Sequence, residues 1–121
     1  MHYTVLAGGT GAAKFLKGLI QVVPQNQIHV IVNVGDDLDV WGLHVSPDID
    51  SVLYALSGQL DAERGWGLSH ESFRCLEKIA TLGMPSWFRL GDLDLATHLA
   101  RTELLRSLPF DQVTARLAAS I

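Results

Sequence analysis

The chain has 121 residues, of which 48% are hydrophobic, and its formal net charge at pH 7 is −4. This composition predicts one globular domain, and the negative charge disfavours nucleic acid or an anionic membrane as a partner. No apolar run reaches the roughly 20 residues that span a bilayer, and the N-terminus lacks the pattern of a secretory signal, so we expect a cytoplasmic location. The single cysteine, Cys75, excludes an internal disulfide and a thiolate metal site. Its helical context predicts a small buried core residue.

The first third of the chain predicts a βαβ unit. Residues 3–7 and 28–33 are short apolar segments rich in valine and isoleucine, as in parallel strands that are covered on both faces. Residues 12–23 between them predict a helix that ends at Pro24, and such a unit makes a right-handed crossover. The predicted fold class is therefore α/β with a parallel sheet.

The remainder of the chain is predicted to be helical. The expected helices span residues 47–57, 70–82, 92–108 and 111–120. Ser46 and Ser69 are the expected N-caps of the first two, and Pro47 suits the first helical position. Two strands do not make a stable parallel sheet. We therefore expect residues 1–121 to be the N-terminal, helix-rich portion of a single α/β domain whose C-terminal remainder is absent.

A glycine loop, AGGTGAAK, follows the first predicted strand and opens the first helix. Glycines permit the tight turn and let backbone N–H groups approach an anion at the positive end of the helix. Phosphate is the natural ligand, and the residues that would line its site are Gly8, Gly9, Thr10, Gly11 and Lys14. The loop lacks the ending of a P-loop, and Lys14 stands where the third glycine of the dinucleotide fingerprint belongs. A glycine-rich turn without a ligand is the alternative.

The segment from residue 33 to residue 58 combines five carboxylates, one histidine and three glycines. The carboxylates are Asp36, Asp37, Asp39, Asp48 and Asp50. Gathered in one cleft they would repel one another, so their clustering indicates a bound cation, basic partners or a role in proton transfer. The alternative is a solvated acidic loop in which each carboxylate caps a turn or a helix. His44 fits a ligand or a structural histidine equally well.

A second polar segment reads WFRLGDLDLATHLARTELLR. Arg89 and Asp92 precede a predicted helix on which Asp94, His98 and Arg101 share one face, at spacings of four and three residues. The opposite side of this helix is apolar, so we expect the helix to bury that side and to present its charged side. The alternative to a functional role is a surface helix with ordinary charge pairs.

Three blocks in order, AGGTGAAK, NVGDDLDVWGLHVSPDIDSVLYALSG and WFRLGDLDLATHLARTELLR, with RGWGL between the last two, resemble the CofD family of 2-phospho-L-lactate transferases. The resemblance covers essentially the whole chain, although family members are considerably longer. It implies a Rossmann-like three-layer fold and a Mg²⁺-dependent reaction in biosynthesis of the deazaflavin coenzyme F-420. A guanosine diphosphate-activated donor gives a phospholactyl, phosphoenolpyruvyl or phosphoglyceryl group to the terminal ribityl hydroxyl of the deazaflavin FO, and GMP is released.

The same resemblance implies roles for individual residues. Asp50 and Arg89 are expected to contact the acceptor, with His44 and Asp92 as further substrate contacts. Asp50 is also the expected catalytic residue, as proton acceptor or metal ligand. The expected Mg²⁺ ligands are Asp50, Asp48 and Asp37.

Alternatives from other classes stay open. A nicotinamide-binding domain would use Asp36 or Asp37 to hold a ribose, but the third glycine of its fingerprint is missing. It also leaves the block from Arg89 to Arg101 unexplained. A non-catalytic nucleotide-binding fragment, or a regulator similar to the YvcK-like nucleotide-sugar-binding proteins, would carry these motifs without turnover. An exposed sheet edge and uncovered apolar helix faces also predict a homo-oligomer.

Overall fold

The computed structural model describes residues 1–121, and it begins with the expected βαβ unit. Strands β1 (Tyr3–Ala7) and β2 (Ile28–Val32) pair in parallel, with Tyr3 opposite Ile28 and Ala7 opposite Val32. Helix α1 (Gly9–Leu19) and a short 3₁₀ turn (Gln25–Gln27) connect them. The α/β class is therefore confirmed, and the glycine loop lies between a strand and a helix as predicted.

The core of this unit lies on one face of the two-stranded sheet. Helices α1 and α2 (Pro47–Leu56) pack there, so that Ala7, Leu16 and Val52 form a buried cluster. On the other face Leu6 and Ile31 remain 79% and 59% exposed. The expectation that both faces are covered is therefore wrong for these residues, because the helices that form this core lie on one side of the sheet. The predicted three-layer arrangement is thus not fully confirmed.

A β-hairpin that the sequence did not indicate lies between β2 and α2. Its strands are β3 (Leu38–Val40) and β4 (Leu43–Val45), which pair antiparallel. The turn residues Trp41 and Gly42 both have positive φ, as the tight two-residue hairpin turn requires. The strands have only three residues each, and tryptophan is unusual at the first turn position, so the local pattern is weak.

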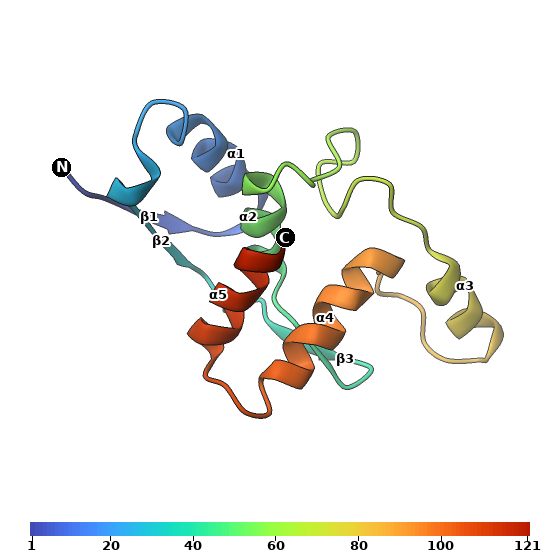
Figure 1. Ribbon diagram of the computed structural model, residues 1–121. Coiled ribbons are helices and arrows are strands. Elements are labelled where there is room, and N and C mark those ends of the chain that lie inside the picture. The colour runs from blue at the N-terminus through green and yellow to red at the C-terminus, as the bar shows by residue number, and fades with distance from the viewer.

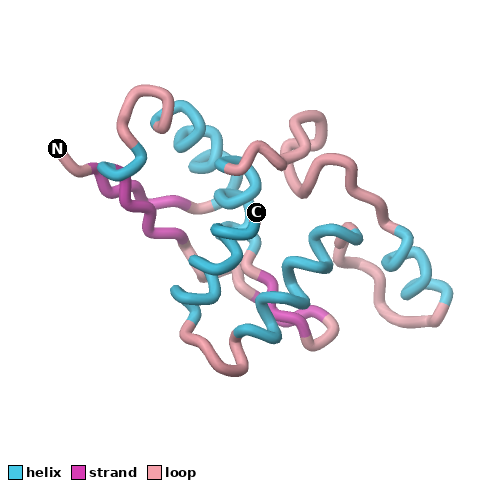
Figure 2. The backbone as a smooth tube through the Cα atoms, viewed as in Figure 1, coloured by secondary structure: helices cyan, strands magenta, loops and turns pink.

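Three further helices complete the chain: α3 (Arg74–Thr81), α4 (Asp92–Leu104) and α5 (Phe110–Ser120). All were expected, although α3 begins four residues later than predicted and α4 ends four residues earlier. Figure 1 shows α3 standing away from the body, while the C-terminal end of α5 lies near α2. Figure 2 shows long loop segments on both sides of α3. None of the helices is both long and apolar enough to cross a bilayer.

The local expectations were confirmed only in part. Ser46 is the N-cap residue of α2 as predicted, although its hydroxyl donates to Asp37 and not to the helix. Ser69 is not the N-cap of α3, and its hydroxyl donates to the Gln59 carbonyl. Cys75 is exposed rather than part of the core. The reason is the position of α3, which packs mainly against α4 and has no buried residue.

A reciprocal clamp joins the start of α3 to the start of α4. The Glu71 carboxylate accepts hydrogen bonds from the backbone N–H groups of Leu93 and Asp94, at 2.7 and 3.0 Å. In the opposite direction, the Asp92 carboxylate accepts from the Ser72 hydroxyl at 2.7 Å and from the Cys75 backbone N–H at 3.0 Å. Carboxylates satisfy free N–H groups and the helix dipole at such ends. The clamp therefore fixes the first turn of α4.

Candidate functional site

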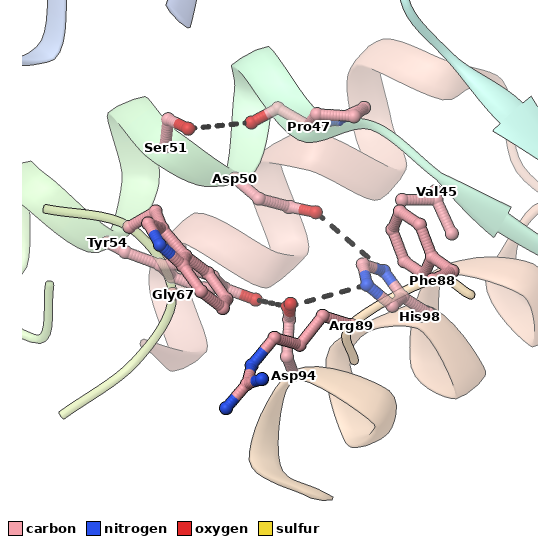
Figure 3. A pocket seen from close by; sticks show the side chains of 11 residues that line it. Val45, Pro47, Asp50, Ser51, Tyr54, Gly67, Phe88, Arg89, Asp94 and His98 are labelled. Atoms are coloured by element: carbon pink, nitrogen blue, oxygen red, sulfur yellow. Dashed lines mark hydrogen bonds and ion pairs between the residues drawn. The ribbon is translucent and has the colours of Figure 1, made fainter. Parts of the chain in front are cut away.

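A pocket lies where α2 and α4 face each other, and the loops on either side of α3 close it. Figure 3 shows Asp50 and Tyr54 projecting from α2 toward Asp94 and His98 of α4. The lining residues are Val45, Pro47, Asp50, Ser51, Tyr54, Trp66, Gly67, Phe88, Arg89, Asp94 and His98. The pocket thus combines aromatic walls with a polar floor.

The helical repeat explains why these side chains converge. Asp50 and Tyr54 are four residues apart on α2, and Asp94, His98 and Arg101 follow at four and three residues on α4, so each set shares one face. Pro47 at the start of α2 and the clamp at the start of α4 fix where each face begins. The two faces meet across the pocket.

The polar floor is a connected network of buried side chains. The Tyr54 hydroxyl donates to Asp94 Oδ1 at 2.6 Å, and His98 Nε2 lies 3.4 Å from that oxygen. His98 Nδ1 lies 3.7 Å from Asp50 Oδ2. Arg101 donates to both oxygens of Asp50, from Nη1 to Oδ2 at 3.1 Å and from Nη2 to Oδ1. The guanidinium of Arg101 compensates the charge of Asp50, as burial of ionic groups requires.

This network reverses the expected orientation of α4. His98 is 1% exposed and Arg101 is 0% exposed, whereas Leu93 and Leu99 are 49% and 52% exposed. The interpretation as an ordinary surface helix, with its apolar side buried, is therefore wrong. The physical reason is that Asp50 on α2 supplies the partner that lets Arg101 be buried.

The surroundings shift the pKa values of the acidic groups in different directions. Burial raises the pKa of Asp50 above its ordinary value of 3.8, although Arg101 and His98 act in the opposite direction. Burial also raises the pKa of Asp94, but His98, Tyr54 and Arg101 together outweigh that effect and hold it below 3.8. Burial and the charges of Asp50 and Asp94 raise the pKa of Tyr54, so its hydroxyl stays protonated. Asp94 is therefore the more firmly ionised carboxylate.

One group of side chains in the pocket is compatible with a divalent metal ion. Asp50, Asp94 and His98 each offer a ligand atom, and these atoms all lie within 4.8 Å of one another. Two carboxylates and an imidazole are ligands of common divalent metals. Of the expected ligands, Asp50 belongs to this group, whereas Asp37 and Asp48 lie in other surroundings.

Arg89 and Asp50, the two expected acceptor contacts, line the same pocket although 39 positions separate them in the sequence (89 − 50). The Arg89 guanidinium is exposed and stacks on Phe73, with its carbon 4.8 Å from the ring centroid. Arg64 lies near the same ring, at 5.5 Å. Phe73 therefore supports Arg89 by a cation–π contact.

The other two expected substrate contacts lie outside the pocket lining. Asp92 belongs to the clamp and is committed to the start of α3. His44 Nε2 lies 3.0 Å from Asp37 Oδ2, which also accepts from the Ser46 hydroxyl at 2.9 Å. The backbone N–H of His44 donates to the Thr102 hydroxyl at 2.8 Å. His44 and Asp37 thus join the hairpin to α2 and α4.

The glycine loop lies beside Asp48. Gly8 is extended, and Gly9 opens α1 with a φ of +69°. A Cβ atom at Gly8 would lie 3.5 Å from Asp48 Oδ2, an oxygen that accepts from Asn33 Nδ2 at 2.9 Å. Asp48 itself is 7% exposed. The structure therefore places one carboxylate directly beside the expected phosphate loop.

The rest of that loop reaches the surface. Thr10, Gly11 and Lys14 are exposed. Asp36 and Asp39 are exposed as well, so the acidic residues of this segment do not gather in one cleft. The other three acidic residues lie in different places: Asp48 beside the glycine loop, Asp37 against His44 of the hairpin, and Asp50 in the pocket.

Sequence reasoning missed the contributions of Tyr54, Trp66 and Phe88 to the pocket. Tyr54 could have been found, because it lies one helical turn after Asp50 on the same face. Trp66 and Phe88 lie on loops, and no periodic pattern indicates where such side chains point. Arg101 was noted only as part of a charged helix face, without its partner Asp50.

Known proteins that are similar to this chain are transferases. A family model described as 2-phospho-L-lactate transferase CofD matches residues 3–121. A phosphoenolpyruvate transferase of Streptomyces griseus is 48% identical over 121 residues, covering 98% of this chain and 38% of the relative. Phosphoenolpyruvate transferases of Nocardia farcinica and Mycobacterium tuberculosis are 48% and 42% identical over 115 and 132 residues. They cover 93% and 97% of this chain, and 35% and 40% of those relatives.

The chain therefore spans about two fifths of the length of the curated relatives that it matches, at 38% and 40% for two of them. The family model nevertheless accounts for all but the first two residues. On that match, the chain belongs to the CofD family.

Proposed function

We propose that this chain carries the acceptor pocket and a phosphate site of a CofD-type transferase of coenzyme F-420 biosynthesis. The donor is a guanosine diphosphate-linked phospholactyl, phosphoenolpyruvyl or phosphoglyceryl compound, and the acceptor is the deazaflavin FO. The observation that carries the proposal is that Asp50 and Arg89, expected as acceptor contacts from the sequence, line one pocket. Its aromatic residues, Tyr54, Trp66 and Phe88, suit a planar heteroaromatic ring.

The reaction joins two substrates by phosphoryl transfer. The terminal ribityl oxygen of FO forms a bond to the phosphorus that carries the three-carbon acid, and the bond from that phosphorus to the GMP oxygen breaks. The hydroxyl proton must leave, and Asp50 is the proposed acceptor, since burial raises its pKa toward that of a useful base. Catalysis of this kind depends on positioning and charge neutralisation.

Arg89 supplies positive charge to the pocket lining. Arg89 is held on Phe73 and lines the pocket beside Asp94. An exposed guanidinium can pair with an anionic group of either substrate. We therefore assign Arg89 to substrate binding, while Asp92 and His44 act by holding α3 and the hairpin in place.

We also propose Mg²⁺ as the metal. The carboxylates of Asp50 and Asp94 supply the oxygen ligands that Mg²⁺ prefers, and His98 suits it less well. Asp48 remains a proposed ligand beside the glycine loop, where a cation would offset repulsion between its carboxylate and a phosphate. Asp37 remains a weaker candidate. A bound Mg²⁺ would neutralise phosphate charge.

An FO titration in the presence of Mg²⁺, followed by fluorescence, tests this function. We expect saturable binding by the chain, weaker binding by Asp50→Asn and Arg89→Ala, and unchanged binding by Arg106→Ala. Arg106 is the matched control because its side chain is 76% exposed and its guanidinium pairs with the exposed Glu103, away from the pocket lining. Absence of binding by a folded wild-type chain, or equal binding by all variants, would refute the acceptor assignment.

Binding without turnover is a second candidate function. It is favoured by the share of the relatives that this chain covers, which is 38% for the Streptomyces griseus protein. In that case FO binds and GMP is never released when the donor is added. The family match supports both of these candidates over a nicotinamide-binding domain, which should bind a nicotinamide dinucleotide and be indifferent to Arg89→Ala. We further expect a cytoplasmic homo-oligomer.

A further inference from the structure

We propose that Arg101 is a positioning residue, which fixes the His98 ring as the tautomer with its proton on Nε2 and fixes Asp50 in one orientation. Arg101 does not line the pocket, yet it contacts Asp50 and His98, which do. Its side chain is 0% exposed. Any effect on a bound molecule must therefore pass through Asp50 and His98.

The tautomer follows from donor and acceptor chemistry. Arg101 Nη1 lies 3.2 Å from His98 Nδ1. A guanidinium can only donate hydrogen bonds, so Nδ1 must accept with its lone pair, and a neutral imidazole then carries its proton on Nε2.

The position of Asp94 agrees with that tautomer. His98 Nε2 is buried and makes no hydrogen bond, and its nearest acidic oxygen is Asp94 Oδ1 at 3.4 Å. That oxygen already accepts from the Tyr54 hydroxyl. The Nε2 proton thus lies toward an oxygen of Asp94, and a small approach of the two side chains would complete a hydrogen bond.

Asp50 is fixed by the same guanidinium. Both of its oxygens accept from Arg101, which is the two-point geometry that restricts rotation of a carboxylate. A lysine at position 101 would retain the charge but offers a single ammonium group rather than a planar fork. Arg101→Lys should therefore keep part of the effect, and Arg101→Met should abolish it.

The tautomer can be observed without any ligand. A long-range ¹H–¹⁵N spectrum of the ¹⁵N-labelled chain distinguishes protonated from unprotonated ring nitrogens, and the spectrum of His98→Asn identifies the His98 signals by their loss. We expect Nδ1 unprotonated and Nε2 protonated in the wild type at neutral pH. A proton on Nδ1, alone or together with one on Nε2, would overturn the proposal.

Variants then test whether Arg101 is the cause. In Arg101→Met we expect the fixed Nε2-protonated signature to be lost, whereas it should persist in Arg106→Met, whose substituted residue is exposed. An unchanged signature in a folded Arg101→Met chain would overturn the proposal. Because removal of a buried partner can prevent folding, the wild-type spectrum and Arg101→Lys decide the matter if this variant does not fold.

The consequence for the acceptor rests on the proposed function. We expect FO affinity to fall roughly tenfold or more in Arg101→Met and less in Arg101→Lys, since a hydrogen-bonded charged group is lost only in the former. FO affinity equal to that of the wild type in a folded Arg101→Met chain would overturn the positioning role. Failure of the wild type to bind FO would refute the proposed function instead, because the tautomer is measured without FO.

Discussion

Replacement of Tyr54 by phenylalanine removes one hydrogen bond from the centre of the pocket network. The Tyr54 side chain is 2% exposed, and its hydroxyl donates to Asp94 Oδ1 at 2.6 Å. A hydrogen bond to a charged group contributes roughly 1.5 to 3 kcal/mol. The ring stays in place, so no large cavity forms. We therefore expect Tyr54→Phe to lower the free energy of unfolding at neutral pH by about 2 kcal/mol.

The pH dependence of this loss follows from Asp94. Its pKa in the folded chain lies below the ordinary value of 3.8, so it contributes stability that is present above 3.8 and is lost as the pH falls through the folded value. Tyr54→Phe removes one of the causes that lower this pKa. The difference between wild type and variant should therefore be full at neutral pH and should shrink as the pH falls below 3.8.

Urea unfolding followed by tryptophan fluorescence measures both effects, since the chain has three tryptophans. The matched control is Tyr3→Phe, because Tyr3 is 38% exposed and its hydroxyl makes no hydrogen bond. That control should change the free energy of unfolding by less than about 0.5 kcal/mol. A loss in Tyr54→Phe no larger than in the control, or a loss that grows as the pH falls, would refute the reasoning.

Three further predictions concern the scaffold. A Cβ atom at Gly91 would clash with the Glu71 side chain, so Gly91→Ala should open the clamp and cost about 1 kcal/mol in urea unfolding. A Cβ atom at Gly18 meets nothing within 4 Å, so the control Gly18→Ala should stabilise α1 by roughly 0.5 to 1 kcal/mol. Leu16 is 0% exposed, so Leu16→Ala should cost about 2 to 5 kcal/mol in the same assay and Leu6→Ala almost nothing; equal losses would contradict the assigned core. The open sheet face should mediate self-association, so Leu6→Lys should lower the mass measured by light scattering, and a wild type that is already monomeric would contradict this.

The parts of the fold that follow from the sequence are those encoded by neighbouring residues. The apolar segment before the glycine loop predicts a strand entering a helix, and Pro47 marks the start of α2. These features need no information from distant residues. The hairpin between β2 and α2 was not predicted, because six strand residues around a Trp41–Gly42 turn give little local pattern.

The buried polar face of α4 could not be predicted for a different reason. The side chains of His98 and Arg101 look like surface groups until the carboxylate of Asp50, 51 positions from Arg101, is brought against them. Burial of a charge depends on its partner, and partners at long range leave no periodic trace in the sequence. Asp50 and Arg89 were singled out by resemblance to a family; local pattern alone did not connect them.

The clamp formed by Glu71 and Asp92 holds together the two ends of the segment that contains α3, so this segment is a closed loop. A backbone hydrogen bond from the Asp92 N–H to the Ser72 carbonyl, at 2.8 Å, also joins the two ends. The entropy of closing such a loop changes by only about 0.6 kcal/mol for each doubling of its length. Helix α3 can therefore vary in length or sequence among homologous chains at little cost, while Arg89 is still delivered to the pocket.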